Sequence, residues 1–250
     1  MNEQVEVFAK MIAESNKIVV FSGAGISTAS GIPDFRSSGG IYDQIKNRHY
    51  SGEEALSVRF MERNPRMFFE NMQKNLSFPD AKPNFGHRFF SELENMNKEV
   101  TIITQNIDDL HEKAGSSKVL PLHGSINRWV TSQGQKPVAN DEVHYQDGIA
   151  VDSQGRSVRP DIVLYGEQLN QVTMRAASQA IQEADLLIVV GTSLMVTPAS
   201  FFVDAFQGRY AVLINQTEVP QMNRFDLVVK EKSSDFLRKV WECIQNALSG

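Results

Sequence analysis

Residues 19–37 read VVFSGAGISTASGIPDFRS, and this stretch decides the fold. An apolar run ends in the Gly-x-Gly turn of Gly23, Ala24 and Gly25, as a strand does in dinucleotide-binding sheets, although such a turn alone is often only a turn. Thr28 stands where the dehydrogenase pattern has its third glycine, and the acidic residue expected about 20 positions further on, at the end of a second strand, is missing. The stretch therefore predicts a nucleotide-binding turn that differs from that of ordinary dehydrogenases.

Apolar runs of strand length recur along the chain, and amphipathic stretches of helical spacing lie between several of them. The runs are continuous rather than alternating, which is typical of strands buried on both faces. We therefore predict an α/β fold with a Rossmann-like parallel sheet covered by helices. The predicted strands are 17–21, 100–104, 119–122, 186–190, 211–214 and 227–229, and the predicted helices are 3–15, 84–96, 107–114, 172–183, 198–206 and 233–248.

Two segments interrupt this alternation of strands and helices. Residues 36–83 hold amphipathic pieces at 53–61 and 67–76 with the helix breakers Pro65, Pro79 and Pro83 around them, which predicts a small helical insert. Residues 128–160 are polar and turn-rich, and they contain a predicted hairpin at 149–159. We predict two domains: a large domain of residues 1–35, 84–127 and 161–250, and a small domain of residues 36–83 and 128–160.

Composition narrows the class of protein. The formal net charge of −5 argues against binding to a nucleic-acid backbone but allows docking onto lysine-rich protein segments. Cys243 is the only cysteine, so neither an intrachain disulfide nor a cysteine zinc cluster can form. No signal-peptide pattern or apolar run of membrane-spanning length is seen. We therefore expect a cytoplasmic protein without membrane contact.

Polar side chains follow five of the predicted strands. The carboxyl ends of parallel strands open into one crevice, so these groups are expected to share a single site. Each group also has an ordinary structural explanation, such as an Asp34–Arg36 ion pair beside a core phenylalanine or a helix cap at Asn106 or Asp108. The residues concerned are Asp34, Phe35 and Arg36; Gln105, Asn106, Ile107 and Asp108; His123; Gly191, Thr192 and Ser193; and Asn215 and Gln216.

Some of these side chains suggest particular chemistry. His123 is placed to act as a general base or acid near neutral pH, although a lone histidine is more often structural. Arg36 could pair with a phosphate, and Phe35 could shield a reactive carbon from water. The other histidines lack a strand-end position and are expected to be structural or on the surface; they are His49, His87, His111 and His144.

Together these motifs resemble the sirtuin family of NAD-dependent protein deacylases. The matching stretches occur in the family's order and span nearly the whole chain. They are residues 23–27, 31–37, 104–108 with Leu110, 114–115, 123–124, 160–167, and 191–194 with Val196 and Pro198. The resemblance implies a Rossmann-like large domain and a small domain built from two insertions, with NAD and an acyl-lysine protein or peptide meeting between them.

The resemblance also implies a role for each matching residue. His123 would be the general base, with Asn106 and Asp108 as further catalytic residues. The acyl-lysine tunnel would be lined by Phe35, His123, Val163 and Tyr165, and Gly166 and Glu167 would pair with the substrate backbone as an added strand. NAD would be bound by Gly23, Ala24, Gly25, Asp34, Phe35, Arg36, Gln105, Asn106, Ile107, Asp108, Gly191, Thr192, Ser193, Asn215, Gln216 and Ser233.

The implied reaction breaks the bond between nicotinamide and ribose, which a dehydrogenase keeps. The acyl oxygen attacks the ribose carbon as nicotinamide leaves, and His123 helps to deprotonate a ribose hydroxyl that then attacks the acyl carbon. The products are free lysine, nicotinamide and O-acyl-ADP-ribose. The extra segment 26–37, with Phe35, is suited to keeping water from the reacting centre.

The chain departs from the family at two places. Most members bind a structural zinc through two Cys-x-x-Cys pairs after the His-Gly motif, whereas residues 128–160 contain no cysteine, so we predict no zinc and expect the hairpin to organise this segment. Tyr165 stands where the family usually has Phe, and its phenol could shift acyl preference or simply face solvent. Acidic residues and a histidine in the segment match no zinc spacing; they are Asp141, Glu142, His144 and Asp147.

Three functions remain open at this stage. A lysine deacylase leads, and segment 39–46 lacks the paired Tyr and Arg of the family's acidic-acyl specialists, which favours neutral acyl chains, acetyl or longer. An NAD glycohydrolase or mono-ADP-ribosyltransferase would break the same bond with another acceptor. An NAD-binding sensor without catalysis is the non-enzymatic alternative. A monomer is expected by resemblance.

Overall fold

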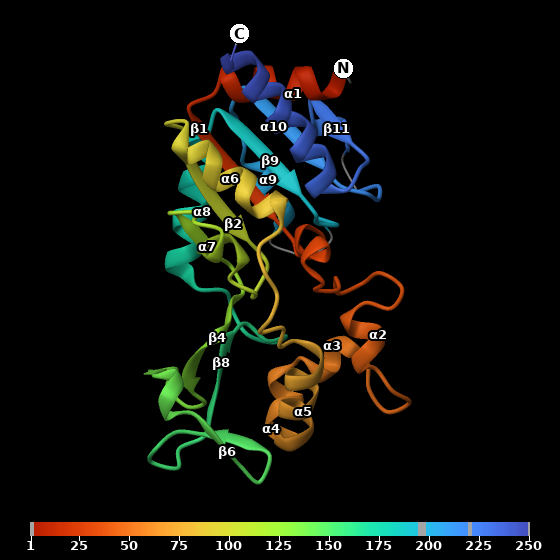
Figure 1. Ribbon diagram of the computed structural model, residues 1–250. Helices are drawn as coiled ribbons and strands as arrows, with labels where there is room; N and C mark the ends of the chain where they lie inside the picture. Colours follow the sequence, from red (N-terminus) through yellow and green to blue (C-terminus); the bar gives the residue numbers. More distant parts are fainter. Residues whose placement is uncertain (1–2, 195–198, 220–221, 250) are drawn as a thin grey trace.

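A six-stranded parallel sheet lies at the centre of the larger part of the molecule, in a computed structural model that describes residues 3–194, 199–219 and 222–249 (Figure 1). Its order is β11–β10–β9–β1–β2–β3, which reverses between β1 and β9. This is the Rossmann arrangement, so the predicted fold class is confirmed, and ligands of such sheets bind where the order reverses. The strands are β1 (Lys17–Ser22), β2 (Glu99–Thr104), β3 (Val119–Pro121), β9 (Leu186–Val190), β10 (Tyr210–Ile214) and β11 (Leu227–Val229).

Helices cover both faces of this sheet. The central strands carry apolar side chains on both faces, so each face needs a covering layer. Ile18 and Val20 of β1 pack in one core with α1, α6 and α10, while Val19 and Phe21 pack in the other with α8 and α9. These helices are α1 (Glu3–Ala13), α6 (Phe85–Asn95), α8 (Gln171–Glu183), α9 (Ala199–Asp204) and α10 (Ser233–Ser249). None of the helices in the described ranges has both the length and the apolar character needed to cross a bilayer.

The second part of the molecule lies at the end away from α1 and α10 (Figure 1). Its helices come from the segment between β1 and α6: α2 (Ile41–Ile45), α3 (Gly52–Ala55), α4 (Val58–Arg63) and α5 (Pro65–Asn75). Its strands come from the segment after β3: β4 (Gly124–Thr131), β5 (Pro137–Val138), β6 (His144–Gln146), β7 (Ile149–Val151) and β8 (Val158–Ile162). The two segments share one apolar core that includes Phe69, Val138 and Val158.

Two predicted helices are shorter than their amphipathic patterns. The helix expected at 53–61 is divided into α3 and α4, because Ser57 leaves the helical conformation and its hydroxyl accepts a hydrogen bond from the amide of Phe60. Pro65, which we expected to break a helix, occupies the first turn of α5, where a proline costs no hydrogen bond. The helix expected at 107–114 is reduced to α7 (Leu110–Lys113), because Asp109 takes a left-handed conformation just before it.

The predicted hairpin at 149–159 is wrong in its pairing. Only one bridge joins its two sides, between Val151 and Ser157. β7 pairs instead with β6, and β8 pairs with β4. The turn between its two sides is present, because the carboxylate of Asp152 accepts hydrogen bonds from the amides of Gln154 and Arg156. Pairing beyond the turn is limited because β6 and β4 take the two sides as their partners. Short 3₁₀ helices complete the fold: η1 (Ala24–Ser30), η2 (Asn140–Glu142) and η3 (Met222–Arg224).

Candidate active site

A cavity of about 710 Å³ opens at the carboxyl ends of the sheet strands, at the point where the strand order reverses. Loops after β1, β2, β3, β9 and β10 all contribute to its wall, together with segments 34–37 and 162–169. Most of the predicted residues line it: Ala24, Gly25, Asp34, Phe35, Arg36, Gln105, Asn106, Ile107, His123, Val163, Tyr165, Gly166, Glu167, Gly191, Thr192, Ser193 and Asn215.

A few predicted residues lie elsewhere. Asp108 lines a small adjoining cavity of about 30 Å³ that shares Ala24, Phe35 and Asn106 with the large one. Gly23, Gln216 and Ser233 are outside the cavity wall, Ser233 being the first residue of α10. Val196 and Pro198, which matched the family pattern, fall outside the residues that the structure describes.

Two glycine turns form a bare backbone surface on the sheet side of the cavity. The amide of Gly25 donates to the carbonyl of Gly191 over 2.8 Å. A Cβ on Gly191 would lie 2.4 Å from the amide nitrogen of Ile26, and Gly191 has a φ of 62°, so only glycine fits there. Such a surface suits close approach of a phosphate group to main-chain atoms.

The ring of His123 is held in one tautomer. Its Nδ1 lies 2.8 Å from the carbonyl oxygen of Gln105, and because a carbonyl can only accept, Nδ1 carries the proton. The other ring nitrogen, Nε2, therefore has a free lone pair. Burial lowers the pKa of His123, although the hydrogen bond to Gln105 opposes that shift. At neutral pH the ring is thus uncharged and able to accept a proton.

A buried hydroxyl connects the two polar residues after β2. Ser27 Oγ donates to Asp108 Oδ2 over 2.6 Å and accepts from Asn106 Nδ2 at 3.1 Å. Asn106 Nδ2 also lies 3.2 Å from the carbonyl of Gly23, which fixes the amide with its oxygen as the free acceptor. Burial raises the pKa of Asp108 even though these hydrogen bonds oppose the shift.

The cap expected at this place is also present. The other oxygen of Asp108, Oδ1, accepts from the amide of Leu110 at the start of α7 over 2.9 Å. Asp108 therefore both caps α7 and belongs to the polar network of the site, because its two oxygens have different partners.

Two buried histidines, His87 and His111, lie next to this network, and His87 contacts Ser27 directly. The amide of Asn84 donates to Nδ1 of His87, so the proton of the His87 ring is on Nε2, which lies 3.3 Å from Ser27 Oγ. Burial lowers the pKa of His87 to about 4, and burial lowers that of His111 as well. Their rings lie 4.9 Å apart, whereas His49 and His144 are exposed.

The loop after η1 is organised by a carboxylate. Asp34 accepts from the amides of Arg36 and Ser37, at 3.0 and 2.7 Å, and from the hydroxyl of Ser37. Arg36 forms its ion pair with Glu53 instead, at 3.6 Å, so the Asp34–Arg36 pair considered as a structural explanation does not form. The Arg36 guanidinium remains on the cavity wall as a half-exposed cation.

The segment after β8 is held by a buried ion pair. Both oxygens of Glu167 contact the guanidinium of Arg159, at 2.6 and 3.1 Å, and Arg159 is only 4% exposed. Glu167 also accepts from the amide of Leu164 at 2.8 Å. The side chain of Glu167 is therefore committed to the protein, which leaves the main chain of Gly166 and its neighbours to contact a ligand.

Several cavity residues were not found from the sequence. The apolar ones among them, such as Leu56, Leu76 and Met174, also fit an ordinary core. Ser37, Ile162 and Leu164 lie within the stretches matched to the family, and Thr217 lies in the strand-end turn after Asn215, but none of the four was assigned a role. Tyr42 brings a hydroxyl that meets that of Tyr165. The missed residues are Ser37, Tyr42, Leu56, Leu76, Ile162, Leu164, Gln168, Leu169, Gln171, Met174 and Thr217.

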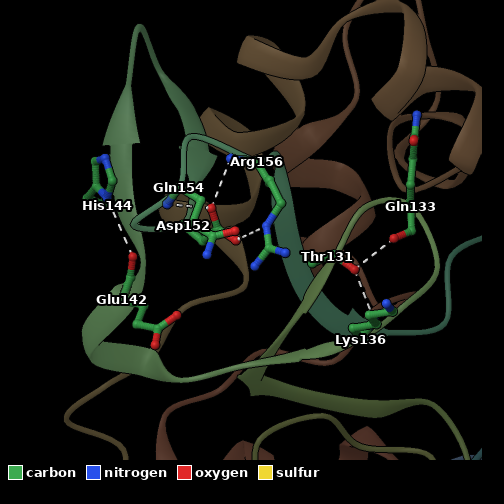
Figure 2. A network of polar contacts seen from close by, with 8 residues as sticks. All are labelled: Thr131, Gln133, Lys136, Glu142, His144, Asp152, Gln154 and Arg156. Carbon is green, nitrogen blue, oxygen red and sulfur yellow. Dashed lines mark hydrogen bonds and ion pairs between the residues drawn. The ribbon is translucent and has the colours of Figure 1, made fainter.

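The cysteine-free segment contains a network of polar contacts (Figure 2). Asp152 is fully buried, and its Oδ2 contacts Arg156 Nε at 2.6 Å while Oδ1 takes two main-chain amides. Burial raises the pKa of Asp152, but the hydrogen bonds from Arg156 and Gln154 outweigh it, so the net shift is downward. Three hydrogen bonds, one of them from a guanidinium, therefore already hold this carboxylate.

A second turn of similar sequence lies nearby. Residues 130–134 and 151–155 share the pattern Val-x-Ser-Gln-Gly, and Thr131 in the first turn plays the part of Asp152 by accepting the amide of Lys136 at 3.0 Å (Figure 2). Ser132 joins the turns through its amide, 2.9 Å from the carbonyl of Ser157. No group of three or more His, Cys, Asp or Glu side chains able to hold a metal occurs among the described residues, which include all of 128–160. The residues present do not fit zinc.

Comparison with known proteins gives a consistent result. The model of the Sir2 family matches residues 23–198. An NAD-dependent protein deacetylase of Staphylococcus epidermidis is 40% identical over 236 residues, which cover 94% of this chain and 96% of that protein.

Solved structures agree over nearly the whole length. The crystal structure of a Sir2 homolog–NAD complex superposes with a TM-score of 0.86 at 31% identity, covering 97% of this chain and 94% of the other. A Sir2 structure with a deacetylated peptide and 3′-O-acetyl ADP-ribose superposes with a TM-score of 0.84 at 33% identity, covering 95% and 97%.

Proposed function

This chain belongs to the Sir2 family, and from that premise we propose that it is an NAD-dependent protein lysine deacylase, which transfers the acyl group to ADP-ribose and releases nicotinamide. The observation that carries the proposal is the state of His123. Its ring is uncharged, its Nδ1 proton is fixed on Gln105, and its Nε2 is free in the same cavity as Asn106 and Arg36. A hydroxyl group of a sugar bound there has a proton acceptor within the wall.

The donor set of the cavity fits NAD. The bare main chain around Gly25 and Gly191 and the cation of Arg36 suit the pyrophosphate. The side chains of Gln105, Asn106 and Asp108 suit the nicotinamide ribose and carboxamide. Thr192, Ser193 and Asn215, which follow β9 and β10 and also line the cavity, suit the adenosine half. Ala24, Asp34, Phe35 and Ile107 line the same cavity, which supports their share in this binding. A share for Gly23, Gln216 and Ser233, which lie outside the wall, is proposed from the family resemblance alone.

When bound, NAD supplies the electrophilic ribose carbon and the nicotinamide leaving group. The protein's part is to orient and to protect. Asn106 is immobilised by Ser27 and the carbonyl of Gly23, so it presents a fixed acceptor. Phe35 lies in the wall of both cavities and keeps water from the reacting carbon. His123 takes the proton of a ribose hydroxyl on Nε2.

The substrate side of the cavity favours an acylated lysine in an extended peptide. Val163, Tyr165, Phe35 and His123 line a mainly apolar passage, and the main chain at Gly166 is free to add the peptide as a strand. The only cation we assign on this wall is Arg36, which is already paired with Glu53. Neutral acyl chains, acetyl or longer, therefore suit the passage better than acidic ones.

We also propose that the protein works without zinc. The support is positive rather than an absence: the Asp152 carboxylate is buried and accepts hydrogen bonds from Arg156 and from main-chain amides, and the two turns are joined through Ser132 and Ser157. These contacts perform the organising role that a structural metal has elsewhere. We further propose a cytoplasmic monomer that binds neither nucleic acids nor membranes, for which the net charge of −5 is the main support.

The decisive experiment is mass spectrometry of a reaction with NAD and lysine peptides carrying acyl groups from acetyl to myristoyl. Free lysine and O-acyl-ADP-ribose should appear together, and both should vanish with His123→Ala. Nicotinamide release of equal rate without peptide would instead indicate an NAD glycohydrolase, and transfer of ADP-ribose to protein a mono-ADP-ribosyltransferase. NAD binding without any turnover would indicate a sensor.

A further inference from the structure

Two tyrosines from distant parts of the chain meet at the cavity. The hydroxyl oxygens of Tyr42 and Tyr165 lie 2.5 Å apart, and both residues line the cavity wall. A phenol can donate one hydrogen bond and accept others, so this pair forms a hydrogen bond whichever hydroxyl donates. Burial and this hydrogen bond raise the pKa of Tyr42, so its hydroxyl keeps its proton throughout the working pH range.

Tyr42 is fixed to the loop that is proposed to hold NAD. The amide of Tyr42 donates to the carbonyl of Phe35 at 3.1 Å, and their rings make an edge-to-face contact with centroids 5.4 Å apart. The guanidinium of Arg36 lies 5.4 Å from the centre of the Tyr42 ring. A movement of Tyr42 therefore moves Phe35 and Arg36 together.

Tyr42 is also held from behind by α3. A Cβ on Gly52 would lie 2.5 Å from Cα of Tyr42, so the main chain of α3 packs directly on this residue. The ring consequently has little freedom to turn away from the cavity.

Tyr165 is fixed to the segment that is proposed to hold the peptide. Its amide donates to the carbonyl of Leu56 at 3.0 Å, and its carbonyl accepts from the amide of Val58 at 3.1 Å. It directly precedes Gly166 and Glu167, and it is 41% exposed, so a peptide lying along this strand contacts it. The hydroxyl of Tyr165 thus links the segment proposed to bind the peptide to the loop proposed to bind NAD, through its hydrogen bond with Tyr42.

We infer that the Tyr42–Tyr165 hydrogen bond is a positioning element that couples the two substrates: an acyl-peptide on segment 163–167 fixes Tyr165, which holds the loop of Phe35 and Arg36 closed on NAD. This inference rests on the proposed deacylase function. It predicts positive cooperativity, in which each substrate tightens the other by the same factor. The family usually has Phe at the position of Tyr165. The tyrosine hydroxyl then adds coupling between peptide binding and NAD binding that a phenylalanine would not provide.

The test measures the dissociation constant of NAD with and without a saturating acetyl-lysine peptide in four proteins: wild type, Tyr165→Phe, Tyr42→Phe and the double variant. Phenylalanine keeps every ring contact and removes only the hydroxyl. The tightening by peptide should shrink by about three- to tenfold in each single variant, the size expected for one hydrogen bond of ordinary net strength. The double variant should lose no more than either single one.

Two further readouts separate positioning from stability. The KM for NAD at saturating peptide should rise more than kcat falls, and the thermal midpoint of the ligand-free variants should stay close to that of wild type. Tyr50→Phe is the matched control, because Tyr50 lies in the same part of the fold, stacks edge-on with Phe60 and is not among the cavity residues named above. It should leave the coupling unchanged.

The outcomes distinguish this inference from the function on which it rests. If wild type turns over but both single variants keep its full coupling, or if their losses add in the double variant, the inference is wrong and the deacylase function stands. If wild type makes no O-acyl-ADP-ribose from any peptide, the function is wrong and the inference is withdrawn with it.

Discussion

The buried histidine beneath the site makes the stability of the fold sensitive to acid. His87 is fully buried, and its two ring nitrogens are used by the amide of Asn84 and by Ser27 Oγ. Burial lowers its pKa from the ordinary 6.5 to about 4. Between these two values the unfolded chain binds a proton that the folded chain does not, so the free energy of unfolding falls as the pH falls.

The size of this effect follows from the two pKa values of His87. Each pKa unit of difference between the folded and unfolded chain is worth about 1.4 kcal/mol. At neutral pH His87 is mostly uncharged in both states, so it costs the free energy of unfolding almost nothing. The free energy of unfolding is reduced by about 2 kcal/mol near pH 5 and by about 3 kcal/mol near pH 4. His111, whose pKa burial also lowers, adds to the loss in the same direction. Protonation of His87 also removes the acceptor for the Asn84 amide and weakens the start of α6.

The assay is urea unfolding of wild type and His87→Gln at a series of pH values from 7 to 4. The variant is less stable than wild type at neutral pH because it loses two hydrogen bonds, and the gap between the two proteins should narrow by about 3 kcal/mol as the pH falls. Carboxylates titrate alike in both proteins, so they cancel in the difference. His49→Gln, which alters an exposed ring, should follow wild type throughout. A gap that stays constant with pH would refute the reasoning.

Three other predictions follow from the site and its surroundings. His123→Ala should still bind NAD, by calorimetry, while formation of O-acyl-ADP-ribose in a single turnover falls by about 10²–10⁴-fold, the usual share of a general base; unchanged turnover would remove His123 from the mechanism. Wild type should purify with substoichiometric zinc and keep its thermal midpoint in a chelator, whereas Asp152→Asn should lower that midpoint and the exposed Asp147→Asn should not; a stoichiometric metal would contradict this. Gly191→Ala should destabilise the protein to urea and weaken NAD binding more than Gly134→Ala, which also has a positive φ but has no atom within 4 Å of an added Cβ; equal effects would show that close packing at Gly191 is unimportant.

The sheet strands and the residues directly after them could be predicted from the sequence, because both depend on patterns within a few neighbouring residues. Each central strand is a continuous apolar run, and the residue types directly after it sit at the carboxyl edge whatever the rest of the chain does. His123, Asn106 and Gly191 could therefore be placed in one site from the sequence, and the structure brings them to one cavity. The bounds of β9 agree with the pattern to the residue, because a fully buried strand leaves little choice.

The unpredictable part depends on contacts between distant segments. Tyr42 and Tyr165 are 123 positions apart, and nothing in either local pattern indicates that their hydroxyls meet. The apolar residues Leu76 and Met174 look like core positions because burial under a ligand and burial under a helix require the same side chains. The hairpin at 149–159 was wrong in its pairing because a turn sequence between two apolar runs indicates a reversal of the chain but not the partners of the flanking strands, and the partner of β8 is β4.

The proposal that this protein works without zinc depends on the carboxylate of Asp152. A structural zinc fixes the segments that supply its ligands, so hydrogen bonds between turns would have to take over that task. Here one Val-x-Ser-Gln-Gly turn is held by the side chain of Asp152 and the other by that of Thr131 (Figure 2). The amide of Ser132 joins the two turns by donating to the carbonyl of Ser157. Their valines then complete the burial, since Val130 and Val151 are 6% and 8% exposed. Because each link is a hydrogen bond inside the chain, the links do not depend on a bound metal. Loss of the Asp152 carboxylate would weaken the turn but leave its main-chain hydrogen bonds, from the amide of Asp152 to the carbonyl of Arg156 and from the amide of Gly155 to the carbonyl of Asp152.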